Sequence, residues 1–236
     1  MRYTIAFLAP FVASTLAAPT ATAFPAAASS TSLPRPIIVS KTFDGKMVRY
    51  GRTRTDAAMF IAEDGAVIKN VIINRNVADA IYCRGSCTLE NVWWEDICET
   101  AAVFQQVAGK TSNIIGGGAK SAVDNIFQFN GLGTVSIKDF YAQDYGKVIR
   151  SCGSCKNNGS PRHIQIDGVL AKNGGALCGI NTNFSDTCKI TNSCQNNGKS
   201  CDRYKGVTGS SAGEAVKLGS GPDGTSCTAT GLTSSC

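Results

Sequence analysis

The sequence predicts an all-β protein, a right-handed parallel β-helix built as a single-stranded solenoid. A short pattern recurs along the chain: an apolar residue, a polar one, then Asn, Asp or Gly, then another apolar or small residue. The copies begin at Ile68, Leu89, Ile137, Ile166 and, more weakly, Ile190. Their starts are separated by 21, 48, 29 and 24 residues. The 48 is about two periods in the low twenties, and Ser112–Gly118 fills that gap. Such a period is typical of solenoids, whose coils bury their apolar faces by stacking.

Composition supports strands over helices. The segments are rich in Val, Ile, Phe and Thr, and no long amphipathic helical pattern is present. The 25 glycines and many asparagines supply the positive-φ positions that sharp corners need. A β-sandwich is the alternative architecture, but it would favour hairpin strands at a spacing of about 8–12 residues, which is absent.

The first residues predict a targeting segment. A short basic start precedes the apolar run Ile5–Leu16, and small residues that suit cleavage follow. We expect a signal peptide over residues 1–17, or up to residue 23 if cleavage falls at the second small-residue site. The run is too short to span a membrane and Pro10 interrupts it, so we expect a secreted, extracellular protein with no membrane partner.

The remaining chain is interpreted as a linker followed by one domain. Residues 24–36 are rich in Pro, Ala and Ser, a composition typical of linkers. Residues 37–236 are long enough to form one domain with a continuous core. We expect this domain to be a monomer.

The 11 cysteines all follow the signal segment, and in an oxidising compartment they predict disulfides. The Cys152-Gly-Ser-Cys155 spacing is interpreted as a disulfide, because the single histidine, His163, leaves zinc sites poorly supplied. The odd count leaves at least one cysteine without an intrachain partner. Two glycosylation sequons, at Asn158 and Asn183, are expected on surface loops if they are modified.

The formal net charge of +6 suits a polyanionic partner such as an acidic polysaccharide, although a basic pI can also carry no functional meaning. Nucleic acid is not expected as a partner, because the chain has no basic run, aromatic stacking motif or finger spacing.

The stretch Asp79–Thr100 gathers five acidic residues around a strand-like segment and so suggests a site for a hard cation. Each acidic residue taken singly could equally be a solvated edge position. Trp93 and Trp94 are adjacent on this strand, so one is expected in the core and the other on the surface. His163 is expected to be structural or exposed.

Several motifs, in order from about residue 37 to about residue 227, resemble the family 3 polysaccharide lyases. They begin at Phe43, Glu63, Ala78, Gly116, Phe140 and Ile166. The members of this family are secreted pectate lyases of microbes that attack plant tissue. The resemblance implies a parallel β-helix that cleaves polygalacturonate, the de-esterified form of pectin, by Ca²⁺-assisted β-elimination. The products would be 4,5-unsaturated oligogalacturonides.

The resemblance also implies roles for particular residues. Lys147 and Arg150 stand in the family's Gly-Lys-x-x-Arg arrangement, in which the arginine is the proposed base and the lysine a substrate clamp. Asp79 and Glu99 match acidic calcium positions. The family's second acid, however, is Thr100 here, and two of its lysines are replaced by Gln105 and Asn125.

These replacements leave three functions open. Losing a carboxylate should weaken calcium binding, and losing lysines removes stabilisation of the transition state. The chain is therefore either an active, weakened pectate lyase, an impaired relative that binds pectin or a host cell-wall component, or a structural solenoid. The family's early cysteine is also missing, which suggests Cys98 as the unpaired one.

Overall fold

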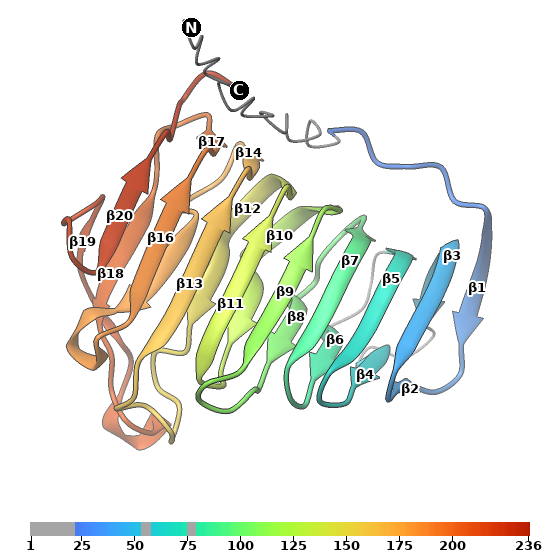
Figure 1. Cartoon of the computed structure of the whole chain (residues 1–236), viewed down its shortest axis with the longest axis horizontal. Coiled ribbons are helices and arrows are strands. Elements are labelled where there is room, and N and C mark those ends of the chain that lie inside the picture. Colours follow the sequence, from blue (N-terminus) through green and yellow to red (C-terminus); the bar gives the residue numbers. More distant parts are fainter. Residues whose placement is uncertain (1–21, 53–57, 75–78) are drawn as a thin grey trace, which may run out of the picture.

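The computed structural model describes residues 22–52, 58–74 and 79–236. In it the chain winds into a solenoid whose coils stack side by side along one axis (Figure 1). The predicted parallel β-helix is confirmed. The helical segments of the described residues are two short 3₁₀ turns, η1 (Thr182–Phe184) and η2 (Ser210–Ala212). Across the same residues, no helix is long and apolar enough to cross a membrane.

The strands form three parallel stacks, here called the first, second and third faces. Long strands turn a corner and contribute to two faces. The first face contains β1 (Ser29–Leu33), the later parts of β3 (Thr42–Arg52), β5 (Ala66–Ile73) and β7 (Cys87–Trp94), the early parts of β10 (Gly118–Phe129) and β12 (Tyr141–Ser151), β14 (Leu170–Lys172) and β17 (Cys194–Gln195).

The second face begins with the early parts of β3, β5 and β7. It continues through β9 (Thr111–Ile115), β11 (Gly133–Lys138), β13 (Arg162–Asp167), β16 (Thr187–Thr191) and β20 (Cys227–Thr230).

The third face contains β2 (Ile37–Val39), β4 (Phe60–Ala62), β6 (Asp79–Cys83), β8 (Thr100–Phe104), the later parts of β10 and β12, β15 (Cys178–Asn181) and β18 (Cys201–Lys205). β19 (Val216–Ser220) pairs antiparallel with β18 and ends this face.

The repeated sequence pattern marks one corner of the solenoid. Its third position adopts positive φ in each copy, at Asn70, Asn91, Asp139, Gly168 and Asn192. Asn, Asp and Gly tolerate this left-handed conformation better than other residues. The Asn91 side-chain amide also donates to the Asn70 Oδ1 at 2.9 Å, which links consecutive coils. The pattern therefore recurs because each coil needs the same turn.

The first position of the pattern fills the core. It is in register from coil to coil on the second face and is at most 1% exposed at each of Ile68, Leu89, Ile114, Ile137, Ile166 and Ile190. Burying one large aliphatic side chain per coil stabilises the stack by about 1.5–3 kcal/mol each. The core is therefore continuous along the solenoid axis.

Both tryptophans are buried, so the expectation that one lies on the surface is wrong. Trp94 points into the core beside Phe127, with ring centroids 5.6 Å apart. Trp93 points outward, but it is only 3% exposed and Phe24 packs against it at 5.1 Å. The segment interpreted as a linker, residues 24–36, thus contains this contact as well as strand β1, which pairs with β3.

Five disulfides cross-link the described residues: Cys83–Cys87, Cys152–Cys155, Cys178–Cys188, Cys194–Cys236 and Cys201–Cys227. The disulfide between Cys152 and Cys155 is confirmed, and Cys98 is the free, exposed cysteine, as predicted. Four of the five bridges lie after residue 151, so covalent cross-links are concentrated in the C-terminal half.

Candidate active site

The predicted site residues lie where the strands of the third face begin. Asp79 opens β6 and pairs with Thr100, which opens β8. Further along the axis, Asn125 in β10 pairs with Lys147 in β12. Two positions later each strand carries a residue of one in-register buried ladder: Ile81, Ala102, Phe127 and Ile149. We call the aligned positions Asp79, Thr100, Asn125 and Lys147 the site column.

One end of the site column is acidic. Asp79 is half-buried, and Glu99 is exposed beside it, immediately before Thr100. Burial raises the pKa of the Asp79 carboxyl, the charge of Glu99 raises it further, and a hydrogen bond with the Thr100 side chain lowers it. The structure thus brings together the two carboxylates that the resemblance assigned to a metal. Thr100, on the coil after Asp79, stands where the resemblance implies a third.

This end offers oxygen ligands of the kind that calcium prefers. Two carboxylates close enough to repel each other gain from a cation, and calcium takes carboxylate, hydroxyl and amide oxygens. Further along the column, Asn125 pairs with Lys147 and is 9% exposed. Its Oδ1 is buried without a hydrogen-bond partner among the described residues. The residues therefore fit a hard cation.

Another acidic residue of the Asp79–Thr100 stretch has a structural partner. Glu95 accepts two hydrogen bonds from the Arg49 guanidinium, from Nε at 2.9 Å and from Nη2 at 2.7 Å. This bidentate pair joins β3 to the turn after β7 and accounts for Glu95 without a ligand role.

The other end of the site column is basic. Lys147 and Arg150 both project from β12 over Gly179 of β15. A Cβ atom on Gly179 would lie 2.6 Å from the Arg150 Cδ and 3.1 Å from the Lys147 Cδ. A side chain at position 179 would therefore displace both. Tyr204 of β18 covers the pair, with its ring centroid 4.0 Å from the Arg150 Cζ and 6.0 Å from the Lys147 Nζ.

Arg150 is held in a buried position. It is 9% exposed, and its guanidinium donates to the Ser151 carbonyl, the Gly179 carbonyl at 3.3 Å and the Asn181 Oδ1 at 3.0 Å. Burial lowers the pKa of Arg150, while the neighbouring Tyr204, Asp186 and Asp124 act in the opposite direction. The structure thus fixes a desolvated guanidinium beside the Lys147 ammonium.

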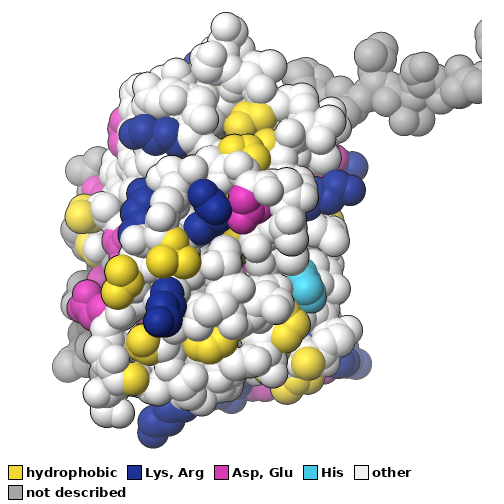
Figure 2. Space-filling model, turned by 90° about the vertical axis from the view of Figure 1, so that its left-hand side faces the viewer, with side chains coloured by type: hydrophobic (Ala, Val, Ile, Leu, Met, Phe, Trp, Pro, Cys, Tyr) yellow, Lys and Arg dark blue, Asp and Glu magenta, His cyan; other side chains and the backbone are white. Residues whose placement is uncertain are grey.

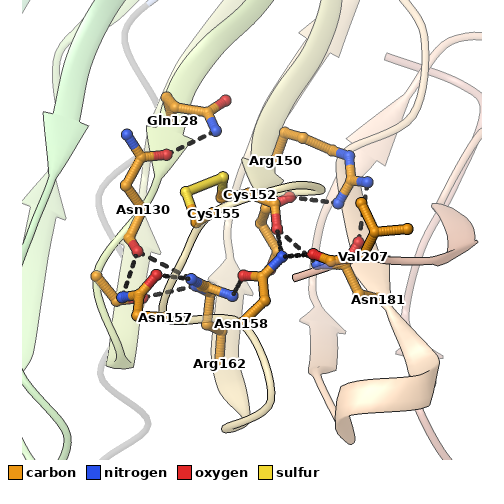
Figure 3. The surroundings of a disulfide bond; sticks show 12 residues. Gln128, Asn130, Arg150, Cys152, Cys155, Asn157, Asn158, Arg162, Asn181 and Val207 are labelled. Atoms are coloured by element: carbon orange, nitrogen blue, oxygen red, sulfur yellow. Dashed lines mark hydrogen bonds between the residues drawn. A yellow bond between two sulfur atoms is a disulfide. The ribbon is translucent and has the colours of Figure 1, made fainter. Parts of the chain in front are cut away.

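A polar network behind Arg150 connects it to the turn closed by the Cys152–Cys155 disulfide (Figure 3). Asn181 donates from Nδ2 to the Cys152 carbonyl at 3.0 Å, and Asn158 donates to the same carbonyl at 3.0 Å. Arg162, fully buried, donates to the Asn158 Oδ1 at 2.8 Å and to the Gly131 carbonyl at 2.6 Å.

The sequence did not reveal this network. Arg162 occupies a strand position that burial alone would give to an apolar residue, and nothing local indicates its distant acceptors. The partners of Arg150, Tyr204 and Asn181, lie in β18 and β15 and come close only through coil stacking. The one sequence signal that could have suggested this network is an arginine at the start of a strand, Arg162, close after the asparagine pair Asn157 and Asn158.

Two sequence expectations about surface residues have different outcomes. Asn158 is 8% exposed, and its side-chain amide donates to the carbonyls of Cys152 and Val207, so the expected surface position for this sequon is wrong. The folded protein thus offers no free amide at Asn158 for glycosylation. Asn183 is exposed as expected.

His163 is half-buried and bonded at 2.8 Å to the Thr187 hydroxyl, which is a structural contact between coils.

Comparisons with known sequences identify related proteins. A profile of the family described as pectate lyase matches residues 21–211. Pectate lyase E of Emericella nidulans is 42% identical over 207 residues, which cover 84% of this chain and 81% of that protein. A probable pectate lyase F of Aspergillus terreus is 46% identical over 153 residues, covering 64% of this chain and 65% of that protein.

Solved structures give the same result. The catalytic domain of pectate lyase PelI from Erwinia chrysanthemi superposes with a TM-score of 0.73 and is 31% identical, covering 88% of this chain and 97% of that one. A structure of PelI in complex with tetragalacturonic acid has a TM-score of 0.72 at 31% identity, covering 86% of this chain and 68% of that one. These proteins share the solenoid.

Proposed function

Because the chain belongs to the pectate lyase family, we propose that it cleaves polygalacturonate by Ca²⁺-assisted β-elimination. The observation that carries this proposal is the pair of cations, Lys147 and Arg150, aligned on one face with the carboxylates of Asp79 and Glu99. The first group suits an anionic substrate, and the second suits a hard cation.

Asp79 and Glu99, with the Thr100 hydroxyl beside Asp79, are the residues that would hold calcium. Bound calcium would neutralise the substrate carboxylate and stabilise the negative charge that develops next to it in the transition state.

The chain's own residues would carry the proton transfer. Arg150 takes the C5 proton of a galacturonate residue, the C5–H electrons form the C4–C5 double bond, and the C4–O bond breaks. The departing O4 then acquires a proton. Burial of Arg150 supports a basic role because desolvation favours the neutral guanidine. Lys147 holds the substrate carboxylate and stabilises the enolate-like charge.

A direct assay tests the reaction. The 4,5-unsaturated product absorbs in the ultraviolet, so the secreted protein is mixed with polygalacturonate in the presence of calcium and, separately, of a chelator. We expect absorbance to rise with calcium and not with chelator. No rise at any calcium concentration would refute the lyase proposal.

Thr100 favours a second candidate function, binding of pectin or another cell-wall component without turnover. It pairs in register with Asp79, in the position where the resemblance places a second acid. If the absorbance assay is negative, retention on immobilised pectate that is lost at high salt would support this binding function over a purely structural role.

Secretion is part of the proposal. Polygalacturonate is an extracellular polymer, and disulfides persist in oxidising compartments. The proposed signal segment, residues 1–17, lies outside the described residues. Expression of the full chain in a fungal host, followed by N-terminal sequencing of the protein in the medium, would locate the cleavage site.

A further inference from the structure

A pocket of about 560 Å³ lies directly beyond the basic end of the site column. Its floor includes Gly146, adjacent to Lys147, and Gly175 on the next coil. These glycines stack so closely that a Cβ on Gly175 would lie 2.0 Å from the Gly146 carbonyl oxygen. Since neither position can carry a side chain, the floor stays open next to Lys147.

Lys199 extends the site column into this pocket. It lies two residues before Cys201, which pairs with Cys178, and Cys178 pairs with Ile149, two residues after Lys147. Lys199 therefore stands two coils beyond Lys147 at the equivalent position, about 10 Å away at the usual strand spacing. Its side chain is exposed, and its Nζ contacts the Gly174 carbonyl at 3.4 Å.

A second lysine lines the opposite wall. Lys217 of β19 pairs with Asp202 at 2.7 Å, and Asp202 also accepts from the Ser220 hydroxyl at 2.8 Å. Burial would raise the pKa of Asp202, but the hydrogen bonds from Lys217 and Ser220, with the charges of Lys217 and Lys147, hold it below its usual value. Asp202 is thus ionised and paired with Lys217. Because two lysines outnumber this one carboxylate, the pocket carries a net positive charge.

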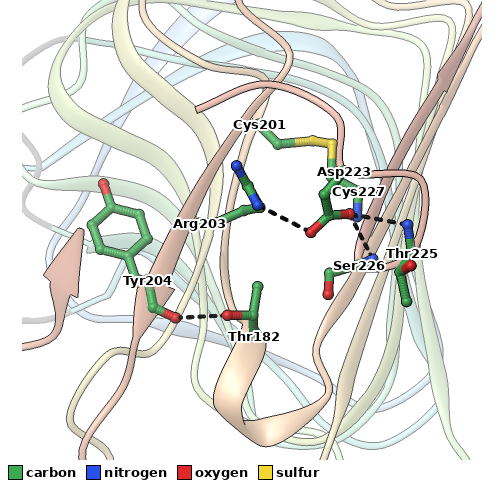
Figure 4. A network of polar contacts seen from close by, with 8 residues as sticks. All are labelled: Thr182, Cys201, Arg203, Tyr204, Asp223, Thr225, Ser226 and Cys227. Atoms are coloured by element: carbon green, nitrogen blue, oxygen red, sulfur yellow. Dashed lines mark hydrogen bonds and ion pairs between the residues drawn. A yellow bond between two sulfur atoms is a disulfide. The ribbon is translucent and has the colours of Figure 1, made fainter. Parts of the chain in front are cut away.

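The wall is rigidly anchored. The Cys201–Cys227 disulfide ties β18 to β20, and the ion pair of Arg203 with Asp223, at 3.3 Å, ties β18 to the loop before β20 (Figure 4). Asp223 also accepts the backbone N–H groups of Thr225, Ser226 and Cys227. Figure 2, which looks onto the C-terminal end of the solenoid, shows several Lys and Arg side chains on this surface, with acidic and hydrophobic side chains among them.

We propose that this pocket is a subsite that binds the carboxylate of a second uronate residue of the polysaccharide through Lys199 and Lys217. The inference rests on the proposed function. One pyranose unit of a 1,4-linked chain is close in length to one strand spacing. A chain laid along the site column with one carboxylate at Lys147 and Arg150 therefore places another, about two units on, at Lys199.

Substrates of two lengths test the subsite. Initial rates are measured on digalacturonate, which is too short to reach Lys199, and on hexagalacturonate, with the full chain and with the Lys199→Gln variant. Calorimetric Kd replaces KM for a substrate that is not cleaved. We expect Lys199→Gln to raise KM for the hexamer about tenfold more than KM for the dimer, the lower end of the range for one hydrogen bond to a charged group. Asp202→Asn should act in the opposite direction and lower KM for the hexamer, because it removes the pocket's negative charge.

Lys41→Gln is the matched control, since it removes an exposed lysine from the first coils and should change neither KM. Equal effects of Lys199→Gln on both lengths, or none, would overturn the subsite while leaving the lyase proposal intact. If the unmodified protein cleaves neither substrate, the lyase proposal fails instead. Calorimetric binding of hexagalacturonate then decides the subsite, and affinity unchanged by Lys199→Gln would reject it.

Discussion

The acidic and basic ends of the site column are built in different ways. Arg150 at the basic end is buried, bonded to three acceptors and covered by Tyr204, and four disulfides lie in the surrounding coils. At the acidic end Glu99 is exposed and Asp79 is half-buried against its charge. The protein itself therefore organises the cations, whereas the two carboxylates repel each other.

The largest expected effect comes from the centre of the basic end. Arg150→Ala should lower kcat on polygalacturonate by about 10²–10⁴-fold, because it removes the proposed general base. Arg84→Ala, which removes an exposed arginine paired with Glu63 at 2.8 Å, is the control and should leave kcat unchanged. A pH–rate profile of Arg150→Lys adds a second readout, since a different base must shift the profile. Full activity in Arg150→Ala would show that another group accepts the proton.

The next effect concerns Tyr145, which precedes Gly146 and whose hydroxyl donates to the Gly175 carbonyl at 3.3 Å. Tyr145 is 5% exposed, and burial raises the pKa of its phenol from 10.0 to about 12. The unfolded chain therefore loses this proton at lower pH than the folded chain does. Stability should be unaffected below pH 10, fall by up to about 2.7 kcal/mol between pH 10 and 12, and change no further above that through this group.

Urea unfolding across this pH range measures the effect. The Tyr145→Phe variant should lose this part of the pH dependence, because it has no phenol to ionise. Identical pH slopes in the two proteins would mean that the phenol is not responsible.

A smaller effect tests whether the polar network orients Arg150. Asn181→Ala removes the acceptor for the Arg150 Nη2 and the donor to the Cys152 carbonyl. We expect kcat to fall about 10- to 100-fold, the range of about 1.4–2.7 kcal/mol. Asn196→Ala, which removes an inter-coil contact with Asn173 at 3.2 Å, is the matched control. Equal losses in both variants would indicate general destabilisation instead of a role in positioning Arg150.

The smallest effect addresses the acidic end. Thr100→Asp places a third carboxylate beside Asp79 and should tighten calcium binding about tenfold, or about 1.4 kcal/mol. Calorimetry with calcium chloride measures this, and melting curves provide an independent readout. Without calcium the variant should melt lower than the unmodified protein because of the added repulsion, and with calcium the gap should close. Unchanged affinity would place the calcium site elsewhere.

Some of the site was accessible from local sequence. The Gly-Lys-x-x-Arg motif located Lys147 and Arg150, and the missing family cysteine suggested Cys98 as the free one. Residues three apart in a regular strand point to opposite faces, so only the structure shows that Lys147 and Arg150 both lie over Gly179. Asn158 and Trp93 show where such reasoning fails. The amide of Asn158 is taken up by two carbonyls, one of them 49 residues away. Trp93 faces outward as alternation requires, but Phe24, from a segment with a linker-like composition, covers it.

The sequence by itself determined the solenoid, because a positive-φ corner residue and a buried aliphatic residue recur from coil to coil. Each of them is visible in the local sequence of its own coil. Only the tertiary structure decided which side chains meet across coils. Loops of unequal length separate the coils, so the register that aligns Asp79 with Thr100, and Lys147 with Lys199, depends on how the whole stack packs. The burial of Arg150 beneath Tyr204 has the same origin, since desolvation is a property of the assembled stack and not of either strand alone.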